Sequence, residues 1–391
     1  MRRPLISLLV ATLGSLASPA TAQPDGFEVV ASGLGFAVNM AFLPDGRILV
    51  ADKGGAIRVV DDGRLRDRPL ATLPADATNN ETGLLGLAVD PAFPEQPWVY
   101  AYVSDATDGS NKLVRLAVEG MRADAPETLF DAIATTPIHN GGDLAFGTDG
   151  SLFLVTGDGA EETRSQDPDD PRGKVLRFDV DQGVAMTIHA SGIRNSFGLC
   201  VDPRSGDLFE TENGPSAWDE VNRVEEGADL GWPSQLGPGG EPTYVDPLVG
   251  FEEVVVLTGC STTGFARDGL YATDFRGQLH HVVRREDAVD SEIVATFDGG
   301  ATDVAFGPDG ALYVLTTDTL YRSAAPDEED GVGNDGGADP SGPAEPPTPT
   351  PTPTPAVDGG FGAALGTTGG IVVIAVLVLA FVWLRGRALR R

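Results

Sequence analysis

The sequence predicts an all-β fold, a six-bladed β-propeller ectodomain with a C-terminal transmembrane helix. Three observations lead to this prediction: a strand–turn–strand unit that occurs six times, few helix signals between residues 23 and 325, and one long apolar segment near the C-terminus. The first two observations define the propeller, and the third defines the helix.

The six units differ in sequence but share one pattern. Each is an apolar strand, a turn rich in Pro, Asp and Gly, and a second alternating strand. They read MAFLPDGRILVAD, LAVDPAFPEQPWVYAYV, LAFGTDGSLFLVTGD, LCVDPRSGDLFETEN, GFARDGLYATDF and VAFGPDGALYVLTTD, about 40 to 66 residues apart. Several are followed by a third strand, which is typical of propeller blades; a parallel β-helix has shorter rungs without hairpins.

The last unit has three strands before the following linker. We therefore expect the N-terminal segment FEVVAS, residues 27–32, to supply its fourth strand and to close the ring. Closure removes the open sheet edge that would otherwise pair with other chains.

The ends of the chain carry targeting signals. Residues 1–22 read as a signal peptide, with a basic start, an apolar run and an Ala-Thr-Ala cleavage site. Residues 326–362 form an acidic and Pro/Thr-rich linker, residues 363–384 an apolar transmembrane helix, and residues 385–391 a basic tail. Because basic flanks stay in the cytoplasm, we expect the propeller to lie outside the cell, at its surface.

The formal net charge is −31, from 58 acidic and 27 basic residues. Such a field repels nucleic acid and excludes it as a partner. The charge bias runs along the whole chain, with only three lysines, and indicates adaptation to high salt, where screening reduces self-repulsion.

The two cysteines are Cys200 and Cys260. A location outside the cell permits a disulfide. Cys200 lies in the apolar strand-like run FGLCVD, which favours a small buried thiol instead.

Polar residues lie just before or just after the predicted strands, on the face where a propeller gathers its functional loops. Imidazole can accept a proton at neutral pH, arginine binds oxyanions or carboxylates, and carbonyl and carboxylate oxygens suit calcium. The candidate residues from three consecutive blades are Glu81, His139, Arg194, Asn195, Gly214, Pro215, Asp219 and Glu220.

Each candidate also has a plain structural interpretation. His139 suits a turn, Arg194 a surface salt bridge, and Glu81 a solvated loop. The other histidines, His189, His280 and His281, lie in predicted outer strands and are expected to be ordinary strand residues.

Seven motifs, in this order, resemble those of the soluble quinoprotein glucose and aldose sugar dehydrogenases, also grouped as glucose/sorbosone dehydrogenases. They are TGLLGLAVDPAF, HNGGDLAFG, VTGD, GKVLRFD, GIRNSFGL, ENGP with DEVN, and GADLGWP, within a match from about residue 27 to 322. The resemblance implies a six-bladed propeller that binds pyrroloquinoline quinone (PQQ) and calcium and oxidises the C1 hydroxyl of a sugar by hydride transfer.

The resemblance also implies roles for individual residues. His139 matches the general base, and Glu81 and Asp219 match positions near the substrate. Cofactor contacts are implied for Arg194, Asn195 and Arg276, and calcium contacts for Gly214, Pro215 and, at a second ion, Glu220.

Two departures from the family pattern concern charge. Asp143 stands where the family often has arginine, and residues 300–302 (Gly-Ala-Thr) stand where it commonly has arginines that neutralise the cofactor's carboxylates. The alternative functions are therefore a non-catalytic sugar- or protein-binding propeller and a calcium-dependent lactonase-type hydrolase, which needs a carboxylate-ringed metal. The sequence does not identify the sugar, the electron acceptor or the oligomeric state.

Overall fold

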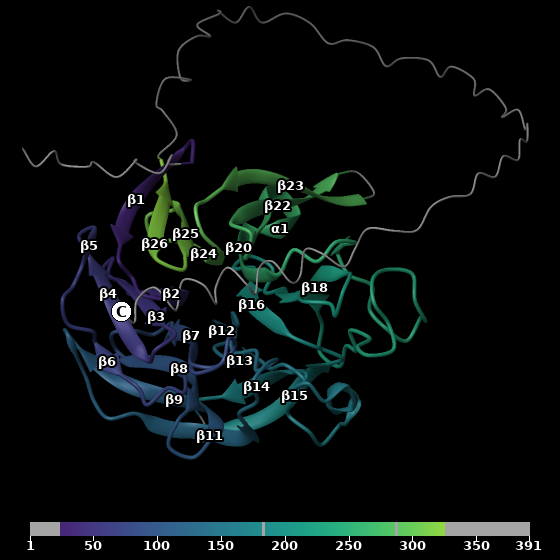
Figure 1. The fold of residues 1–391 in the computed structure, drawn as a ribbon, viewed down its shortest axis with the longest axis horizontal. Coiled ribbons are helices and arrows are strands. Elements are labelled where there is room, and N and C mark those ends of the chain that lie inside the picture. Colours follow the sequence, from purple (N-terminus) through teal and green to yellow (C-terminus); the bar gives the residue numbers. More distant parts are fainter. Residues whose placement is uncertain (1–23, 182–183, 286–287, 325–391) are drawn as a thin grey trace, which may run out of the picture. The chain divides into compact units, whose positions relative to one another are not determined.

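The computed structural model describes residues 24–181, 184–285 and 288–324, and it confirms the predicted six-bladed β-propeller (Figure 1). The predicted signal peptide (1–22), linker (326–362), transmembrane helix (363–384) and cytoplasmic tail (385–391) lie outside these residues. Within them, no helix is long and apolar enough to cross a membrane.

Each blade is an antiparallel sheet whose first strand lies nearest the propeller axis (Figure 1). Blade 1 contains β2 (Ala37–Phe42), β3 (Ile48–Asp52), β4 (Ala56–Asp61), β5 (Arg64–Leu65) and β6 (Ala71–Thr72). Blade 2 contains β7 (Leu84–Val89), β8 (Trp98–Asp105), β9 (Ser110–Glu119), β10 (Arg122–Ala123) and β11 (Glu127–Ala134). Blade 3 contains β12 (Leu144–Phe146), β13 (Leu152–Val155), β14 (Lys174–Asp179) and β15 (Ala185–Ser191), with the short 3₁₀ helix η1 (Glu162–Gln166) between β13 and β14.

The remaining three blades follow the same plan. Blade 4 contains β16 (Ser196–Val201), β17 (Leu208–Glu212), β18 (Asp219–Val224) and β19 (Val249–Phe251). Blade 5 contains β20 (Leu257–Gly264), β21 (Gly269–Asp274), β22 (Gln278–Arg285) and β23 (Ala288–Thr296), with helix α1 (Phe265–Asp268) after β20. Blade 6 contains β24 (Ala301–Phe306), β25 (Leu312–Thr316), β26 (Thr319–Ser323) and β1 (Phe27–Ser32).

An Asp-Gly pair lies in the turn between the first two strands of blades 1, 3 and 6. In blade 3, Gly150 has φ +83° with open space where a Cβ would be, so glycine is needed there for its backbone conformation alone. Asp149 Oδ1 accepts the backbone N–H of Ser151 at 3.0 Å, which fixes the turn from its own side chain.

The core consists of apolar layers between neighbouring blades. Leu49 of blade 1 and Leu87 and Leu116 of blade 2 belong to one such layer, and all three are at most 2% exposed. Burial of side chains of this kind contributes about 1.5–3 kcal/mol each, so the sheets are held face to face by the hydrophobic effect.

The N-terminal strand closes the ring as predicted. Strand β1 pairs with β26, with Phe27 opposite Ser323 and Ser32 opposite Thr319. Blade 6 is thereby assembled from both ends of the described chain.

Near the axis, either a polar side chain or a glycine occupies the equivalent position in or directly before each inner strand. A Cβ on Gly86 would lie 2.1 Å from Gly142 O, so the glycines leave room for their neighbours. The six positions are Asn39, Gly86, Asp143, Gly198, Gly259 and Asp303.

Asp143 is a structural residue of this layer. Its Oδ1 accepts Asn39 Nδ2 at 3.0 Å and its Oδ2 accepts Leu199 N at 2.7 Å, which joins blades 1, 3 and 4. Burial raises its pKa to about 7, against the opposing effect of these donors. Asp143, which stands where the family often has arginine, therefore links the inner strands by hydrogen bonds.

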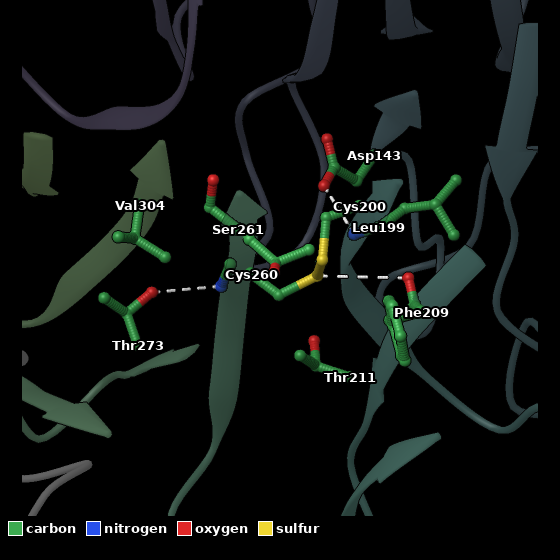
Figure 2. The surroundings of a disulfide bond; sticks show 12 residues. Asp143, Leu199, Cys200, Phe209, Thr211, Cys260, Ser261, Thr273 and Val304 are labelled. Atoms are coloured by element: carbon green, nitrogen blue, oxygen red, sulfur yellow. Dashed lines mark hydrogen bonds between the residues drawn. A yellow bond between two sulfur atoms is a disulfide. The ribbon is translucent and has the colours of Figure 1, made fainter. Parts of the chain in front are cut away.

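The two cysteines form a disulfide, so the prediction of a free buried thiol at Cys200 is wrong. Cys200 on β16 and Cys260 on β20 are bonded, with an S–S distance of 2.03 Å (Figure 2). The two inner strands are neighbours, and each cysteine projects into the apolar layer between blades 4 and 5. Both side chains are buried as expected, but they face each other rather than lying apart.

Candidate functional site

His139 lies in the loop that enters the inner strand of blade 3, where the sequence placed it. Its backbone has φ +61°, a left-handed conformation that is uncommon outside glycine, and the residue is 7% exposed. Its backbone N–H donates to Glu81 Oε2 at 2.6 Å. The histidine is thus held by its neighbours in a fixed and sparsely populated conformation.

The imidazole is oriented by Asp158, which the sequence prediction did not single out. His139 Nδ1 lies 2.7 Å from Asp158 Oδ1, and Asp158 Oδ2 accepts the indole N–H of Trp232 at 2.9 Å. Because a carboxylate only accepts, Nδ1 carries the hydrogen and Nε2 keeps its lone pair. This arrangement prepares Nε2 to accept a proton.

Asp158 was detectable in the sequence. It ends the motif VTGD directly after β13, at the kind of position that was expected to carry functional residues. Trp232 lies in the motif GADLGWP, 74 residues further along the chain, and nothing in that spacing predicts its bond to Asp158.

Glu81 joins three blades instead of lying in a solvated loop. Its Oε2 accepts both the backbone N–H of His139 and, at 3.0 Å, Asn195 Nδ2. Its backbone carbonyl accepts Asn140 Nδ2 at 3.0 Å. Loops from blades 2, 3 and 4 therefore converge at this carboxylate.

Arg194 and Asn195 lie in the loop that enters blade 4, and Glu212 fixes their backbone. Glu212 Oε2 accepts Arg194 N at 2.9 Å and Oε1 accepts Asn195 N at 2.8 Å. The Arg194 guanidinium donates to Asn213 O at 2.7 Å and lies 5.6 Å from the centre of the Trp232 ring. Its contacts among the described residues are backbone carbonyls and the Trp232 ring and include no ion pair, so the salt-bridge interpretation is not supported.

The Gly214–Pro215 loop follows β17, and only glycine fits at its start. A Cβ on Gly214 would lie 2.0 Å from Ala217 O. Arg194 Nη1 approaches Gly214 O at 3.4 Å, which brings this carbonyl beside the guanidinium. Pro215 is exposed.

Asp219 supports this loop from inside the protein. Its Oδ1 accepts Gly214 N at 2.9 Å, and its Oδ2 accepts Val255 N and Val256 N, both at 2.7 Å. It is 0% exposed, and burial raises its pKa against the opposing effect of these donors. The contact of Asp219 with the substrate stays a prediction; in this structure the carboxylate is enclosed, and its oxygens accept three backbone N–H groups.

Glu220 points to the opposite side of β18, as adjacent strand residues do. Its Oε1 accepts Gly237 N at 2.7 Å and its Oε2 accepts Asn222 Nδ2 at 3.1 Å. The structure does not bring Glu220 together with Gly214 and Pro215. A second calcium at Glu220 remains a prediction, separate from the first.

Arg276 lies in the loop between β21 and β22 and is exposed. Its guanidinium donates to Val254 O, next to the two backbone N–H groups that Asp219 accepts. The departure near Ala301 is also visible: Ala301 and Thr302 are buried at the start of β24, and the Phe275 ring packs against Gly300. These positions offer no positive charge.

The other histidines are strand residues, as predicted. His189 is on β15, and His280 and His281 are on β22. His280 Nε2 lies 2.9 Å from the buried Asp274 Oδ2, and His281 stacks on Tyr271 with ring centres 4.4 Å apart. Their partners are internal, and they do not belong to the site.

The Arg194 guanidinium is the donor that the quinone oxygens of PQQ would need. Asn195 Oδ1 and Asn213 Oδ1 are buried without a hydrogen-bond partner among the described residues, beside the Arg194 guanidinium and the Gly214 carbonyl. These two oxygens can only accept, so N–H or O–H groups of a bound molecule would satisfy them and its quinone oxygens would not. Arg276 is the one predicted cation for the cofactor's carboxylates.

The fold and the site define a propeller whose consecutive blades present a carboxylate-held histidine next to an arginine and a glycine-rich loop. Residues 34–325 match the family model described as Glucose / Sorbosone dehydrogenase. The chain belongs to this family, which confirms the resemblance seen in the sequence.

Individual relatives agree with this assignment. The aldose sugar dehydrogenase YliI of Escherichia coli is 26% identical over 358 residues, which is 81% of this chain and 95% of that protein. Quinoprotein glucose dehydrogenase B of Acinetobacter calcoaceticus is 25% identical over 262 residues, 56% of this chain and 55% of that protein.

Solved structures show the same fold. A PQQ-bound aldose sugar dehydrogenase from Streptomyces coelicolor is 29% identical, with a TM-score of 0.68 over 78% of this chain and 99% of that chain. A structure from Thermus thermophilus, described as a putative oxidoreductase (glucose dehydrogenase), is 34% identical, with a TM-score of 0.68 over 76% of this chain and 98% of that one.

Proposed function

We propose that this protein is a PQQ-dependent aldose dehydrogenase that oxidises the C1 hydroxyl of a sugar. The observation that carries the proposal is the His139–Asp158 pair, 2.7 Å apart, beside the Arg194 guanidinium. Trp232 links the two, because its indole bonds Asp158 while its ring lies under the guanidinium. A base and an oxyanion-binding cation lie together, as proton removal from an alcohol requires.

Each residue has a role that its contacts support. His139 Nε2 takes the proton of the C1 hydroxyl, and Asp158 holds the imidazole in the required tautomer and stabilises the imidazolium that forms. Glu81 fixes the backbone of His139 and the amide of Asn195. Arg194 provides positive charge for the cofactor's quinone oxygens.

PQQ would be held by Arg194 and Asn195, with Arg276 at a carboxylate. When bound, it would supply the acceptor for the hydride from C1. Calcium would be held by the backbone carbonyls of Gly214 and Pro215, which are hard oxygen ligands of the kind that calcium prefers. Asp219 contributes by fixing the backbone of this loop.

The direct test is reconstitution. We expect the purified full-length chain, incubated with PQQ and calcium in concentrated NaCl, to oxidise aldoses with an artificial dye as acceptor. His139→Ala should abolish turnover while PQQ binding, followed by its absorbance, persists. The control is His281→Ala, which alters a strand histidine and should leave turnover unchanged. Failure of PQQ to bind at any calcium or salt concentration would overturn the proposal.

A sugar- or protein-binding propeller is the second candidate. The missing positive charge at residues 300–302 favours it, because buried carboxylates of a ligand are costly without partners. Sugar binding by calorimetry without any PQQ binding would identify this case. The lactonase alternative has less support, because no group of three or more His, Cys, Asp or Glu side chains within the described residues is arranged to hold a metal ion.

We also propose that the propeller is anchored at the outer cell surface. The apolar segment 363–384, the basic residues after it and the signal-like residues 1–22 support this proposal, as does a disulfide, which persists in oxidising compartments. Full-length protein should sediment with membranes and be digested by protease added to intact cells, whereas a chain ending before residue 363 should be released.

A further inference from the structure

Lys174, the lysine of the motif GKVLRFD, is a buried cation to which neither the resemblance nor the proposed mechanism assigns a role. It begins β14 and is 1% exposed. Its Nζ donates to three backbone carbonyls, Arg164 O at 2.7 Å, Ser165 O at 2.9 Å and Arg172 O at 2.9 Å. No carboxylate oxygen lies within 4.0 Å of Nζ in the described part of the chain, so its three hydrogens serve the loop backbone.

The ammonium completes the C-terminal end of η1. The last carbonyls of a helix lack partners within the helix, and a cation satisfies them and opposes their negative partial charge. Burial lowers the pKa of Lys174 to about 8, and Asp170, Asp167 and Asp229 oppose this shift. The amine is therefore still mainly charged at neutral pH.

The loop that Lys174 closes is bonded to Trp232. Ser165 Oγ lies 2.9 Å from Trp232 O, and Gln166 Nε2 donates to the same carbonyl at 2.8 Å. Trp232 in turn donates its indole N–H to Asp158 and stacks under Arg194. A continuous set of contacts thus runs from Lys174 to the carboxylate that orients His139.

We propose that Lys174 is a positioning residue for the candidate base. Its ammonium fixes residues 164–172, these residues fix Trp232, and the indole then holds Asp158 at the angle that His139 needs. The inference rests on the proposed function for its kinetic consequences. It goes beyond that function because Lys174 touches neither substrate nor cofactor.

The kinetic test uses Lys174→Met, which keeps the length of the side chain without its charge. We expect kcat to fall about tenfold with little change in the KM for sugar, since positioning is lost and substrate contacts are not. In a plot of kcat/KM against pH, the fall at low pH (the acid limb) should move to higher pH. An Asp158 carboxylate without its indole partner stabilises protonated His139 more strongly, so a higher pH is needed to free the base. Glu81 keeps its contact with the backbone N–H of His139, and Arg194 keeps its bond to Asn213 O, because neither contact involves Trp232.

A double-mutant cycle with Trp232→Phe tests whether Lys174 acts through the indole. Trp232→Phe should itself shift the acid limb, and adding Lys174→Met should change little more. Additive effects would overturn the proposal. Lys112→Met is the matched control: this lysine of blade 2 forms ion pairs with Asp105 and Asp108, away from Trp232, and should keep the wild-type profile.

Hydrogen exchange provides a readout that needs neither PQQ nor turnover. In the Lys174→Met variant, amides of residues 159–173 should exchange about tenfold faster or more, with blade 6 unchanged. Unchanged exchange would overturn the proposal even if the wild-type chain oxidises no sugar. If Lys174→Met does not fold, the double variant Ser165→Ala with Gln166→Ala removes the same link to Trp232. It should shift the acid limb in the same direction. An unshifted acid limb would again overturn the proposal.

Discussion

At the scale of single residues, the site depends on carboxylates that accept backbone or ring N–H groups. Glu81, Asp158 and Glu212 each accept hydrogen bonds from two or more groups of neighbouring loops. Each side chain therefore fixes a loop, and burial raises the pKa of Glu212 well above its usual range. This is why the loops, which have little regular structure, converge in one defined geometry.

Asp158→Asn should impair catalysis without unfolding the protein. The asparagine can donate its amide to His139 Nδ1, which places the imidazole hydrogen on Nε2 and removes the base. We expect kcat/KM for aldose oxidation to fall about 10²–10⁴-fold, measured by dye reduction. Asp149→Asn, at an exposed turn of the same blade, is the control and should retain activity. Equal activities would show that His139 does not depend on this partner.

The sequence identified those site residues whose position in the repeat determines their place. His139 and Arg194 precede inner strands and Gly214 follows the second strand of blade 4, so the repeat places them on one face. The enclosure of Asp219 was not predictable in this way, because it depends on Val255 and Val256 of the following blade. Contacts between distant loops carry no periodic signal.

At the scale of strands, blade 4 buries an acid that the site does not use. Glu210 on β17 is 0% exposed; its Oε1 accepts Asn222 Nδ2 at 2.8 Å, and its Oε2 has no partner within the described residues. Burial raises its pKa to about 8, and the charge of Glu220 contributes in the same direction. The side chain is thus neutral in the folded protein at neutral pH.

Glu210→Gln should change how stability depends on pH. Between about pH 4.5 and about 8 the folded state keeps a proton that the unfolded chain has lost, so wild-type stability falls as pH rises. Glutamine has the shape and hydrogen-bonding groups of the neutral acid but does not titrate. It therefore removes the contribution of Glu210 to the change of unfolding free energy with pH, which is at most about 1.4 kcal/mol per pH unit. Urea unfolding should show equal stabilities near pH 5 and a more stable variant near pH 9. Glu225→Gln, exposed in the same blade, should follow wild type; a parallel curve for Glu210→Gln would contradict the assignment.

The disulfide acts between strands of neighbouring blades, and its pairing follows from the repeat. Neighbouring residues of a strand point to opposite faces of a blade. For a bond between β16 and β20, one cysteine must face blade 5 and the other must face blade 4, so their positions within the repeat must differ by one residue. Cys200 lies two residues after Gly198 and Cys260 one after Gly259, which satisfies this condition. The sequence therefore held the information for this bond, although composition and apolar context favoured a thiol.

Replacing both cysteines by alanine should destabilise the propeller. The bond closes a segment of 60 residues, and loss of such a cross-link costs about 4 kcal/mol on a chain-entropy basis. Urea unfolding should show this loss, and reductant should bring the wild-type chain to the level of the variant. Reductant is expected to leave the variant itself unchanged. Equal stabilities of oxidised wild type and variant would show that the bond does not form.

At the scale of the whole molecule, the repeat alone determined the architecture. The number of strand–turn–strand units gave the number of blades, and the shortage of one strand at the end predicted the pairing of β1 with β26. These features were predictable because they depend on local turns and on alternation, which every repeat carries. Additional edge strands such as β5, β6, β10 and β11 were not, since they are short and lie outside the repeating pattern.

The net charge of −31 leads to a prediction for the whole molecule. Repulsion between exposed carboxylates opposes the compact state, and salt shortens its range from about 10 Å at 0.1 M to about 3 Å at 1 M. The unfolding temperature should therefore rise steeply with NaCl at neutral pH, measured by calorimetry on the full-length chain. At a pH low enough to protonate exposed carboxylates the rise should be much smaller, because the repulsion is already removed. Sucrose, which is uncharged, serves as the control for general exclusion from the protein surface. An equal response to NaCl at both pH values would show that the acidic surface is not the origin of the salt dependence.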